Sequence, residues 1–250
     1  MIFSEWILYI LRKIFLLNSL KTMEWEMLKL VNNDRKFHGL GKLRMQEDLR
    51  DVARKHSRDM ARKNYFEHES ILGKSPFDRL ETARVTDIQS GENLAKIRGH
   101  KNPVLRAEVG LMNSPGHRAN ILNENYNTVG IGIIKSVDQS YYFTQNFARR
   151  ELIFKKKIPK KTTIKKGLHI KGDTFTPVKQ IIYQIKKTPE SQKILKENLI
   201  NVEKNKFNFH VKFDEVGLYN VLIFVNKTGG KGNFSLANKF EISFRKGWFF

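Results

Sequence analysis

The chain has 250 residues, of which 40% are hydrophobic and 11% aromatic, so it can build one large domain or two ordinary ones, and wholesale disorder is excluded. It contains no Cys, which rules out disulfide scaffolds, Cys-ligated zinc, iron–sulfur clusters and thiol catalysis. Lys and Arg number 46 against 25 Asp and Glu, a formal net charge of +21.

The positive charge is concentrated toward the C-terminus. Residues 151–250 carry 21 basic and 8 acidic residues, a net charge of +13, whereas residues 1–150 carry 25 basic and 17 acidic residues. Such a field attracts polyanions, for example an anionic cell-surface polymer or lipid. The alternative is a lysine-rich surface that is only solvated. No signature of a nucleic-acid-binding module is present, so no specific nucleic acid is expected as a partner.

Residues 1–22 are strongly apolar but are interrupted by Glu5, Arg12 and Lys13. The longest uncharged run is too short to span a bilayer comfortably, and no small-residue cleavage site follows it. Two interpretations stay open. The segment is a signal or anchor remnant, or it is an amphipathic helix that belongs to the fold or lies on a membrane.

The next part of the chain, up to residue 148, mixes helices and strands. Apolar residues at helical spacing, and Asn-Pro or Ser-Pro pairs at helix starts, predict helices over 23–33, 46–64, 103–113 and 115–122. Residues 69–90 are expected to be mostly loop, and Glu92 is expected at the end of that loop. Alternating residues over 128–134 and 141–148, separated by Asp138-Gln139, predict a β-hairpin.

The pattern changes after residue 153. Residues 154–161, FKKKIPKK, are expected to form a basic linker. Beyond it, alternating apolar residues predict strands over 162–170, 179–185, 207–213, 218–225 and 239–244. Residues 190–203 have no clear pattern and are expected to be a loop with a short helix. Several strands with little helix favour a small all-β, Ig-like sandwich over residues 162–250.

Three titratable side chains in the first part of the chain suit chemistry. His68 follows the long helix, Glu92 follows a Gly, and His117 occupies the third helical position if Ser114 is the N-cap. The positive end of a helix disfavours a second proton on an imidazole, so His117 is expected to be neutral. Two His and one carboxylate suit zinc with an open coordination position, but the spacing alone does not bring them together.

The order of several segments resembles the CAP superfamily, also called the SCP or pathogenesis-related-1 type domain, and specifically its bacterial and archaeal branch. The segments cover about residues 23–150 and read LKLVNNDR, GLGKLRMQEDLRDVARKHSRDMARKNYFEH, SPFDRL, GENLA, MNSPGHRANIL, TVGIG and YYFTQNF. The resemblance implies an α-β-α sandwich with a broad cleft. The whole chain is then α+β, with a CAP domain over residues 23–153 followed by the linker and the β-sandwich.

The resemblance also implies a cleft. By position, His68 matches the family's first cleft His, Glu92 the Glu of its GEN motif, and His117 the second His. Asn93 and Ser114 are expected to line the same cleft. Because some members bind a divalent metal through the His pair, the resemblance implies Zn²⁺ or another divalent cation at His68 and His117.

The family's second cleft Glu is missing. Leu111 occupies the position where the family has a Trp, and Ser114 occupies the position of the family's carboxylate. Glu108, one helical turn before Leu111, is a candidate substitute for that carboxylate. A single carboxylate cannot be acid and base at once.

The missing carboxylate and the net charge of +13 over residues 151–250 favour a binding module at the cell surface or envelope, tethered by a basic β-domain. The resemblance, together with the apolar N-terminal segment, implies that it is exported and extracytoplasmic. One alternative is a metal-dependent, peptidase-like hydrolase with His68 and His117 as metal ligands and Glu92 as the catalytic base or as a hydrogen-bond partner of a ligand. The other is a lipid-binding protein.

Overall fold

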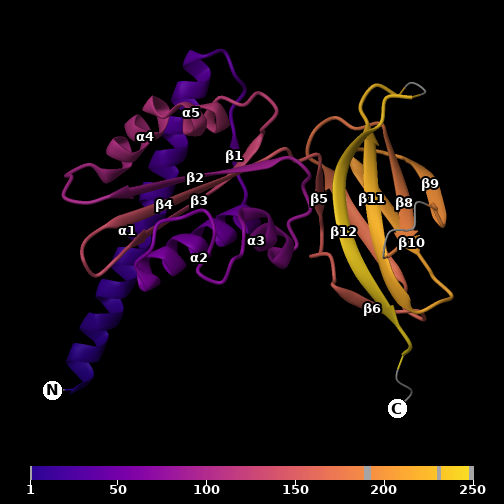
Figure 1. The fold of residues 1–250 in the computed structure, drawn as a ribbon, viewed down its shortest axis with the longest axis horizontal. Helices are drawn as coiled ribbons and strands as arrows, with labels where there is room; N and C mark the ends of the chain where they lie inside the picture. Colours follow the sequence, from indigo (N-terminus) through magenta and orange to yellow (C-terminus); the bar gives the residue numbers. More distant parts are fainter. Residues whose placement is uncertain (1, 189–192, 230–231, 248–250) are drawn as a thin grey trace. The chain divides into compact units, whose positions relative to one another are not determined.

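The computed structural model describes residues 2–188, 193–229 and 232–247, and for residues 2–18 it describes only the backbone (Figure 1). The chain divides into two compact units, which are described separately. Unit 1 consists of Met1–Ala83 and Ser90–Ala148, and unit 2 of Arg84–Gln89 and Arg149–Phe250. The short segment 84–89 lies within the stretch that the sequence assigns to the CAP domain, but it packs with unit 2.

Unit 1 is a four-stranded sheet between two layers of helices (Figure 1). The sheet has the order β1 (Arg44–Met45), β3 (Thr128–Lys135), β4 (Tyr141–Ala148), β2 (Ser90–Ile97), and only the β1–β3 pair is parallel. One face is covered by α1 (Ile2–Phe37), α4 (Pro103–Asn113) and α5 (Pro115–Ile121), and the other by α2 (Glu47–Lys63) and α3 (Pro76–Ala83). The expected α-β-α sandwich is confirmed.

The helix α2 packs closely on the sheet. Its stripe of Leu49, Val52, Ala53, His56 and Met60 is buried, as the helical spacing predicts. Two glycines of β3 make the close approach feasible. A Cβ added at position 130 or 132 would lie 2.1 or 2.2 Å from backbone atoms of α2. A residue with a side chain would therefore push the helix off the sheet.

The helix α1 runs from Ile2 to Phe37 without a break, and its sequence contains neither Gly nor Pro. It thus includes both the apolar N-terminal segment and the helix expected over 23–33. It ends at Gly39, whose φ of 72° places it in the left-handed region, and Leu40 N–H donates to the Arg35 carbonyl. The side chains of residues 1–18 lie outside the described part, so the role of that segment stays a prediction. In the described residues, no helix combines the length and apolarity needed to cross a bilayer.

The segment expected to be loop contains two regular elements. α3 begins at Pro76, a favoured first helical residue, and β2 begins at Ser90. The prediction that Glu92 lies in a loop is wrong, because Glu92 and Asn93 pair with Asn146 and Gln145 in the sheet. Gly, Glu and Asn disfavour strands by propensity, but tertiary pairing with β4 overrides this preference.

Unit 2 is rich in strands. They are β5 (Leu152–Phe154), β6 (Lys161–Thr163), β7 (Leu168–Thr174), β8 (Gln180–Lys187), β9 (Lys196–Asn201), β10 (Lys206–Val211), β11 (Gly217–Asn226) and β12 (Ser235–Arg245). One sheet has the order β10-β7-β5 and the other β6-β12-β11-β8-β9. A single hydrophobic cluster contains side chains of both sheets. Strand β9 lies where a loop with a short helix was expected, so that expectation is wrong for residues 196–201, while 189–192 lie outside the described residues.

Candidate functional site

The site is built around β2, which is a terminal strand of the unit 1 sheet. Successive residues of a strand project to opposite faces, so Glu92 and Asn93 serve different sides of the sheet. Glu92 faces the layer of α2 and α3, where it contacts His68 and Arg79. Asn93 faces the layer of α4 and α5. One dipeptide of β2 thus connects both sides of the candidate site.

Glu92 is held between two basic side chains. Its Oε1 lies 2.9 Å from His68 Nδ1, and its Oε2 accepts a hydrogen bond of 2.6 Å from Arg79 Nη2. The Glu92 side chain is only 3% exposed, whereas that of His68 is 50% exposed. The hydrogen bond to Glu92 raises the pKa of His68, because the carboxylate favours the protonated imidazole. The expected proximity of His68 and Glu92 is therefore seen in the structure.

Arg79 is the site residue that sequence reasoning did not assign. Besides Glu92, its guanidinium donates to the backbone carbonyls of His68 (2.7 Å) and Lys74 (2.9 Å). It thereby fixes the loop between α2 and α3 against β2. Asp59 of α2 accepts from the Tyr65 hydroxyl at 2.7 Å and pairs with Lys63, which is one helical turn away.

A row of amide side chains crosses the other face of the sheet. Asn93 Nδ2 donates to the His117 carbonyl (3.0 Å) and to Gln145 Oε1 (3.2 Å), and Asn93 Oδ1 accepts from Asn120 Nδ2 (2.9 Å). Asn120 also donates to the Glu92 carbonyl at 3.3 Å. Asn93 is fully buried, so its role is to fix α5 against β2. Sequence reasoning did not assign Asn120, although this asparagine lies in the MNSPGHRANIL segment, three residues after His117.

Ser114 and His117 lie at the start of α5. Ser114 is the N-cap, Pro115 follows it, and His117 occupies the third helical position, as predicted. The Ser114 hydroxyl lies 2.9 Å from His117 Nδ1, so it orients the imidazole. Burial, and then the charge of His68, lowers the pKa of His117. Both effects favour the neutral form of the His117 imidazole.

The structure brings two of the three predicted site residues into contact, and the third comes from another layer of the fold. His68 and Glu92 are in direct contact, and His117 comes from the opposite helical layer. Glu108, the suggested substitute for the second carboxylate, does not join them. It is buried in α4, where its Oε2 accepts from Gln145 Nε2 at 3.3 Å on the face opposite to Glu92. Burial raises the pKa of Glu108 to about 8.

The residues present are a poor fit for a three-ligand metal site. Among the described residues, no group of three or more His, Asp and Glu side chains is arranged to hold a metal ion. Both oxygens of Glu92 already have partners, and the permanent charge of Arg79 opposes a second cation at that carboxylate. A divalent cation held by His68 and His117 stays a prediction. Metal analysis of the protein, with and without His68→Ala and His117→Ala, would test it.

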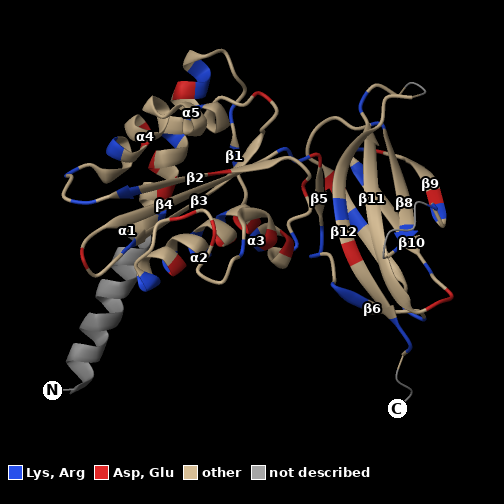
Figure 2. Ribbon diagram, in the orientation of Figure 1, with Lys and Arg blue, Asp and Glu red and all other residues tan. Residues whose placement is uncertain are grey.

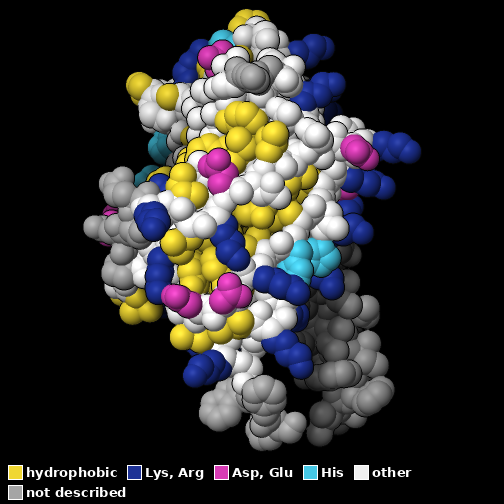
Figure 3. All heavy atoms as spheres, turned by 90° about the vertical axis from the view of Figure 1, so that its right-hand side faces the viewer, with side chains coloured by type: hydrophobic (Ala, Val, Ile, Leu, Met, Phe, Trp, Pro, Cys, Tyr) yellow, Lys and Arg dark blue, Asp and Glu magenta, His cyan; other side chains and the backbone are white. Residues whose placement is uncertain are grey.

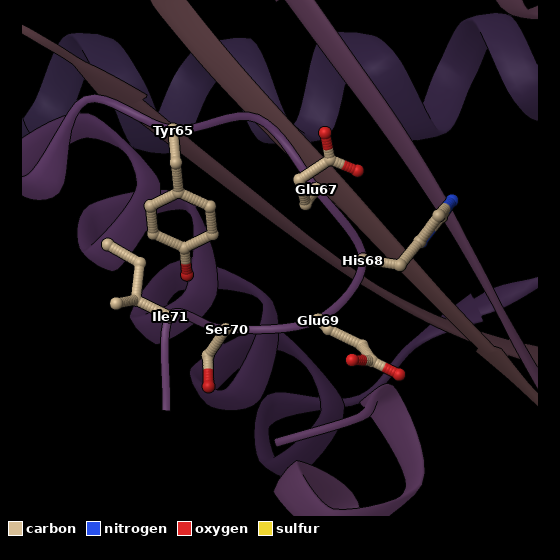
Figure 4. A pocket seen from close by; sticks show the side chains of 6 residues that line it. All are labelled: Tyr65, Glu67, His68, Glu69, Ser70 and Ile71. Carbon is tan, nitrogen blue, oxygen red and sulfur yellow. The ribbon is translucent and has the colours of Figure 1, made fainter. Parts of the chain in front are cut away.

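A shallow hollow of about 450 Å³ adjoins the site on the loop after α2. It is lined by Tyr65, Glu67, His68, Glu69, Ser70 and Ile71. In Figure 4, Tyr65 and Ile71 lie on one side of the loop, and His68 extends on the other side. His68 therefore belongs to the wall of the hollow and to the contact with Glu92.

Comparison with known proteins agrees with this fold. The family described as the Cysteine-rich secretory protein family, or CAP, matches residues 28–147. These residues therefore form a CAP-superfamily domain of the bacterial type. The family is described as cysteine-rich, but this chain has no Cys, so no disulfide contributes to the stability of its α-β-α core.

Two curated relatives come from Bacillus subtilis (strain 168). The uncharacterized protein YkwD is 40% identical over 121 residues, which cover 48% of this chain and 45% of YkwD. The uncharacterized membrane protein YlbC is 43% identical over 129 residues, which cover 52% of this chain and 35% of YlbC. A solved extracellular SCP-domain protein from Bacillus anthracis is 35% identical, with a TM-score of 0.46, and the match covers 52% of this chain and 41% of that one. The chain thus spans less than half the length of these relatives.

Proposed function

We propose that this protein is a non-enzymatic binding module that works outside the cytoplasmic membrane. The CAP domain presents the site around His68, Glu92 and His117, and the basic unit 2 attaches the protein to an anionic cell-surface polymer or lipid. The observation that carries the proposal is that both carboxylate oxygens of Glu92 already form hydrogen bonds, one with His68 and one with Arg79.

A general base needs a lone pair that can reach the substrate. The Glu92 carboxylate is buried and forms an ion pair with the Arg79 guanidinium, so its role is structural. Glu108 lies on the other face of the sheet, so it cannot act as a paired acid with Glu92. What the site offers to solvent is the half-exposed imidazole of His68. This arrangement supports recognition of an anionic or hydrogen-bonding group better than it supports hydrolysis.

The charge of the C-terminal part supports attachment to an anionic surface. Residues 151–250 have a net charge of +13, and Figure 2 shows Lys and Arg along several strands of unit 2, β6 and β12 among them. Clustered lysines near an anionic surface gain about 1 kcal/mol each at low ionic strength. A location at the envelope agrees with the name of YlbC, an uncharacterized membrane protein that is similar to about half of this chain.

Sedimentation of the protein with lipid vesicles tests the proposal. We expect binding to vesicles that contain phosphatidylglycerol, and none to vesicles of phosphatidylcholine alone. Binding should weaken at least tenfold between about 50 and 500 mM NaCl, because salt screens exposed charges. A soluble poly(glycerol phosphate) added as competitor distinguishes lipid from polymer, since a polymer-specific protein binds the polymer and not the vesicles.

A matched pair of charge reversals locates the attachment. Lys156, Lys157 and Lys160 are exposed in unit 2, and Lys55, Arg58 and Arg62 provide an equal exposed charge on α2 of unit 1. Reversing the first set to Glu should abolish binding, and reversing the second should weaken it much less. Binding that ignores salt, or its absence from both anionic ligands at low ionic strength, would refute the proposal.

A further inference from the structure

Two exposed histidines of unit 2 lie opposite each other on neighbouring strands. His169 of β7 and His210 of β10 are direct partners in the antiparallel register. Their ring centroids are 5.8 Å apart, and the ring planes are inclined by 58°. Figure 3 shows histidine side chains at the surface, beside Lys and Arg. The two residues are far apart in the sequence, so only the strand pairing reveals the pair.

The hydrogen bonds of the two imidazoles define which ring nitrogen of each histidine carries the free lone pair. His169 Nε2 is bonded to Asn208 Oδ1, and His210 Nε2 lies 3.0 Å from the Lys166 carbonyl. Both partners are carbonyl oxygens, which only accept hydrogen bonds, so each Nε2 carries the hydrogen. In the neutral imidazole the lone pair is then on Nδ1. Histidines that ligate metals are typically oriented in this way, with the second nitrogen donating to a carbonyl.

The loop before β7 packs directly against the His210 imidazole at Gly167. Gly167 has a φ of 69°, and a Cβ at this position would lie 2.5 Å from His210 Nε2. Any other residue would be strained there and would displace the imidazole. The orientation of His210 is therefore fixed by the backbone of this loop and does not depend on surface packing alone.

The separation of the rings matches that of two imidazoles on one ion. A metal–nitrogen bond of about 2.0–2.1 Å places each ring centroid about 3.2 Å from the metal. Two such rings are then about 5 to 6.5 Å apart for angles between tetrahedral and linear. The observed 5.8 Å lies in this range. We propose that His169 and His210 together bind one divalent transition-metal ion through their Nδ1 atoms.

The surroundings restrict which ion is suitable. Imidazole nitrogen suits copper, nickel and zinc, whereas calcium and magnesium prefer oxygen ligands. Lys166, Lys171 and Lys206 are close in the chain or register and oppose any cation, and no third His, Asp or Glu completes the group among the described residues. Only ions with strong bonds to imidazole overcome this repulsion. The expected order of affinity is Cu²⁺ above Ni²⁺ and Zn²⁺, with no binding of Mg²⁺.

Calorimetric titration of the full chain with Cu²⁺ and Zn²⁺ tests the proposal. A second ligand held in place strengthens binding by about 10²–10⁴, so His169→Asn or His210→Asn should each weaken Cu²⁺ binding by about 100-fold or more. Asn208→Leu should weaken it by about tenfold, because His169 loses its orienting partner.

Two controls make the result specific to this pair. His100→Asn removes an exposed histidine of unit 1 and should leave the affinity unchanged. The double variant His68→Asn, His117→Asn removes the imidazoles of the candidate cleft, so it separates any binding there from binding at unit 2, and the Cu²⁺ affinity of the His169–His210 pair should be unchanged. Electron paramagnetic resonance of the Cu²⁺-loaded chain should show two coupled nitrogens. Binding that persists in His169→Asn, or that is lost only in the cleft variant, overturns the proposal, and equal melting temperatures confirm that the variants are folded.

Discussion

Arg79 joins Glu92 to the loop that carries His68. Its Nη2 donates to Glu92 Oε2 at 2.6 Å, and its Nη1 donates to the His68 and Lys74 carbonyls. The Arg79 side chain is 11% exposed and that of Glu92 is 3% exposed. The same guanidinium therefore neutralises a buried carboxylate and closes the loop over it.

Replacing Arg79 with Ala should lower the free energy of unfolding by about 3 kcal/mol, because Glu92 is left buried without its partner. Urea denaturation measures this change. Arg62→Ala, at an exposed position of α2, is the control and should cost less than about 0.5 kcal/mol. In the double variant with Glu92→Gln the losses should not add, since the uncompensated charge is removed. Additive losses would show that the two side chains are not coupled.

The pKa of His68 should lie above its ordinary value of 6.5 because Glu92 stabilises the protonated ring. The stabilisation of the folded state by the contact of protonated His68 with Glu92 is complete below the ordinary pKa of histidine. It is lost as the pH rises through the raised pKa. An NMR titration of the imidazole should give a lower midpoint in Glu92→Gln. Glu69→Gln, which removes a carboxylate from the same loop, should leave the midpoint unchanged. An identical midpoint in all three proteins would contradict the contact.

Glu108 should make unit 1 less stable as the pH rises. Burial raises its pKa to about 8 from the model-peptide value of 4.5, so the folded state retains a proton that the unfolded state releases. Stability then decreases between these two pH values. Glu108→Gln should remove this loss and gain on the order of 4 kcal/mol at pH 8.5 relative to pH 4.5. The exposed Glu81→Gln is the control, and equal pH profiles of all variants would disprove the assignment.

Gly132 and Gly110 should respond oppositely to substitution by Ala. At Gly132 the new Cβ would lie 2.2 Å from the backbone of α2, so the change should cost more than about 3 kcal/mol or prevent folding. At Gly110, within α4, nothing lies within 4 Å of the new Cβ. Ala should there stabilise the protein by about 0.5–1 kcal/mol, through helix propensity. Thermal melting of the two variants measures both effects, and a tolerated Gly132→Ala would contradict the close packing.

Much of unit 1 could be predicted because its elements have strong local signals. Helical periodicity marks α2, Pro after Asn or Ser marks α4 and α5, and alternation marks the β3–β4 hairpin. β2 could not be predicted in the same way, because a strand that contains Gly, Glu and Asn is defined by its partner β4 and not by its own propensity. The contact of His68 with Glu92 followed from the family resemblance alone.

The partners that sequence reasoning missed are those created by tertiary structure. Arg79 belongs to a motif that the resemblance includes, but only the fold shows that its guanidinium lies on Glu92. His169 and His210 had no local pattern, since their proximity depends on the register of β7 and β10. Such pairs cannot be recognised from spacing along the chain.

The adjacency of Glu92 and Asn93 limits how this domain can vary. Since strand residues alternate between faces, inserting or deleting one residue just before Glu92 would exchange the directions in which Glu92 and Asn93 project. The carboxylate would then project among the amides of the α5 layer, and the amide would face Arg79. Length changes in homologous domains should therefore fall in the loops before Ser90 and after Ile97 and spare the dipeptide between them.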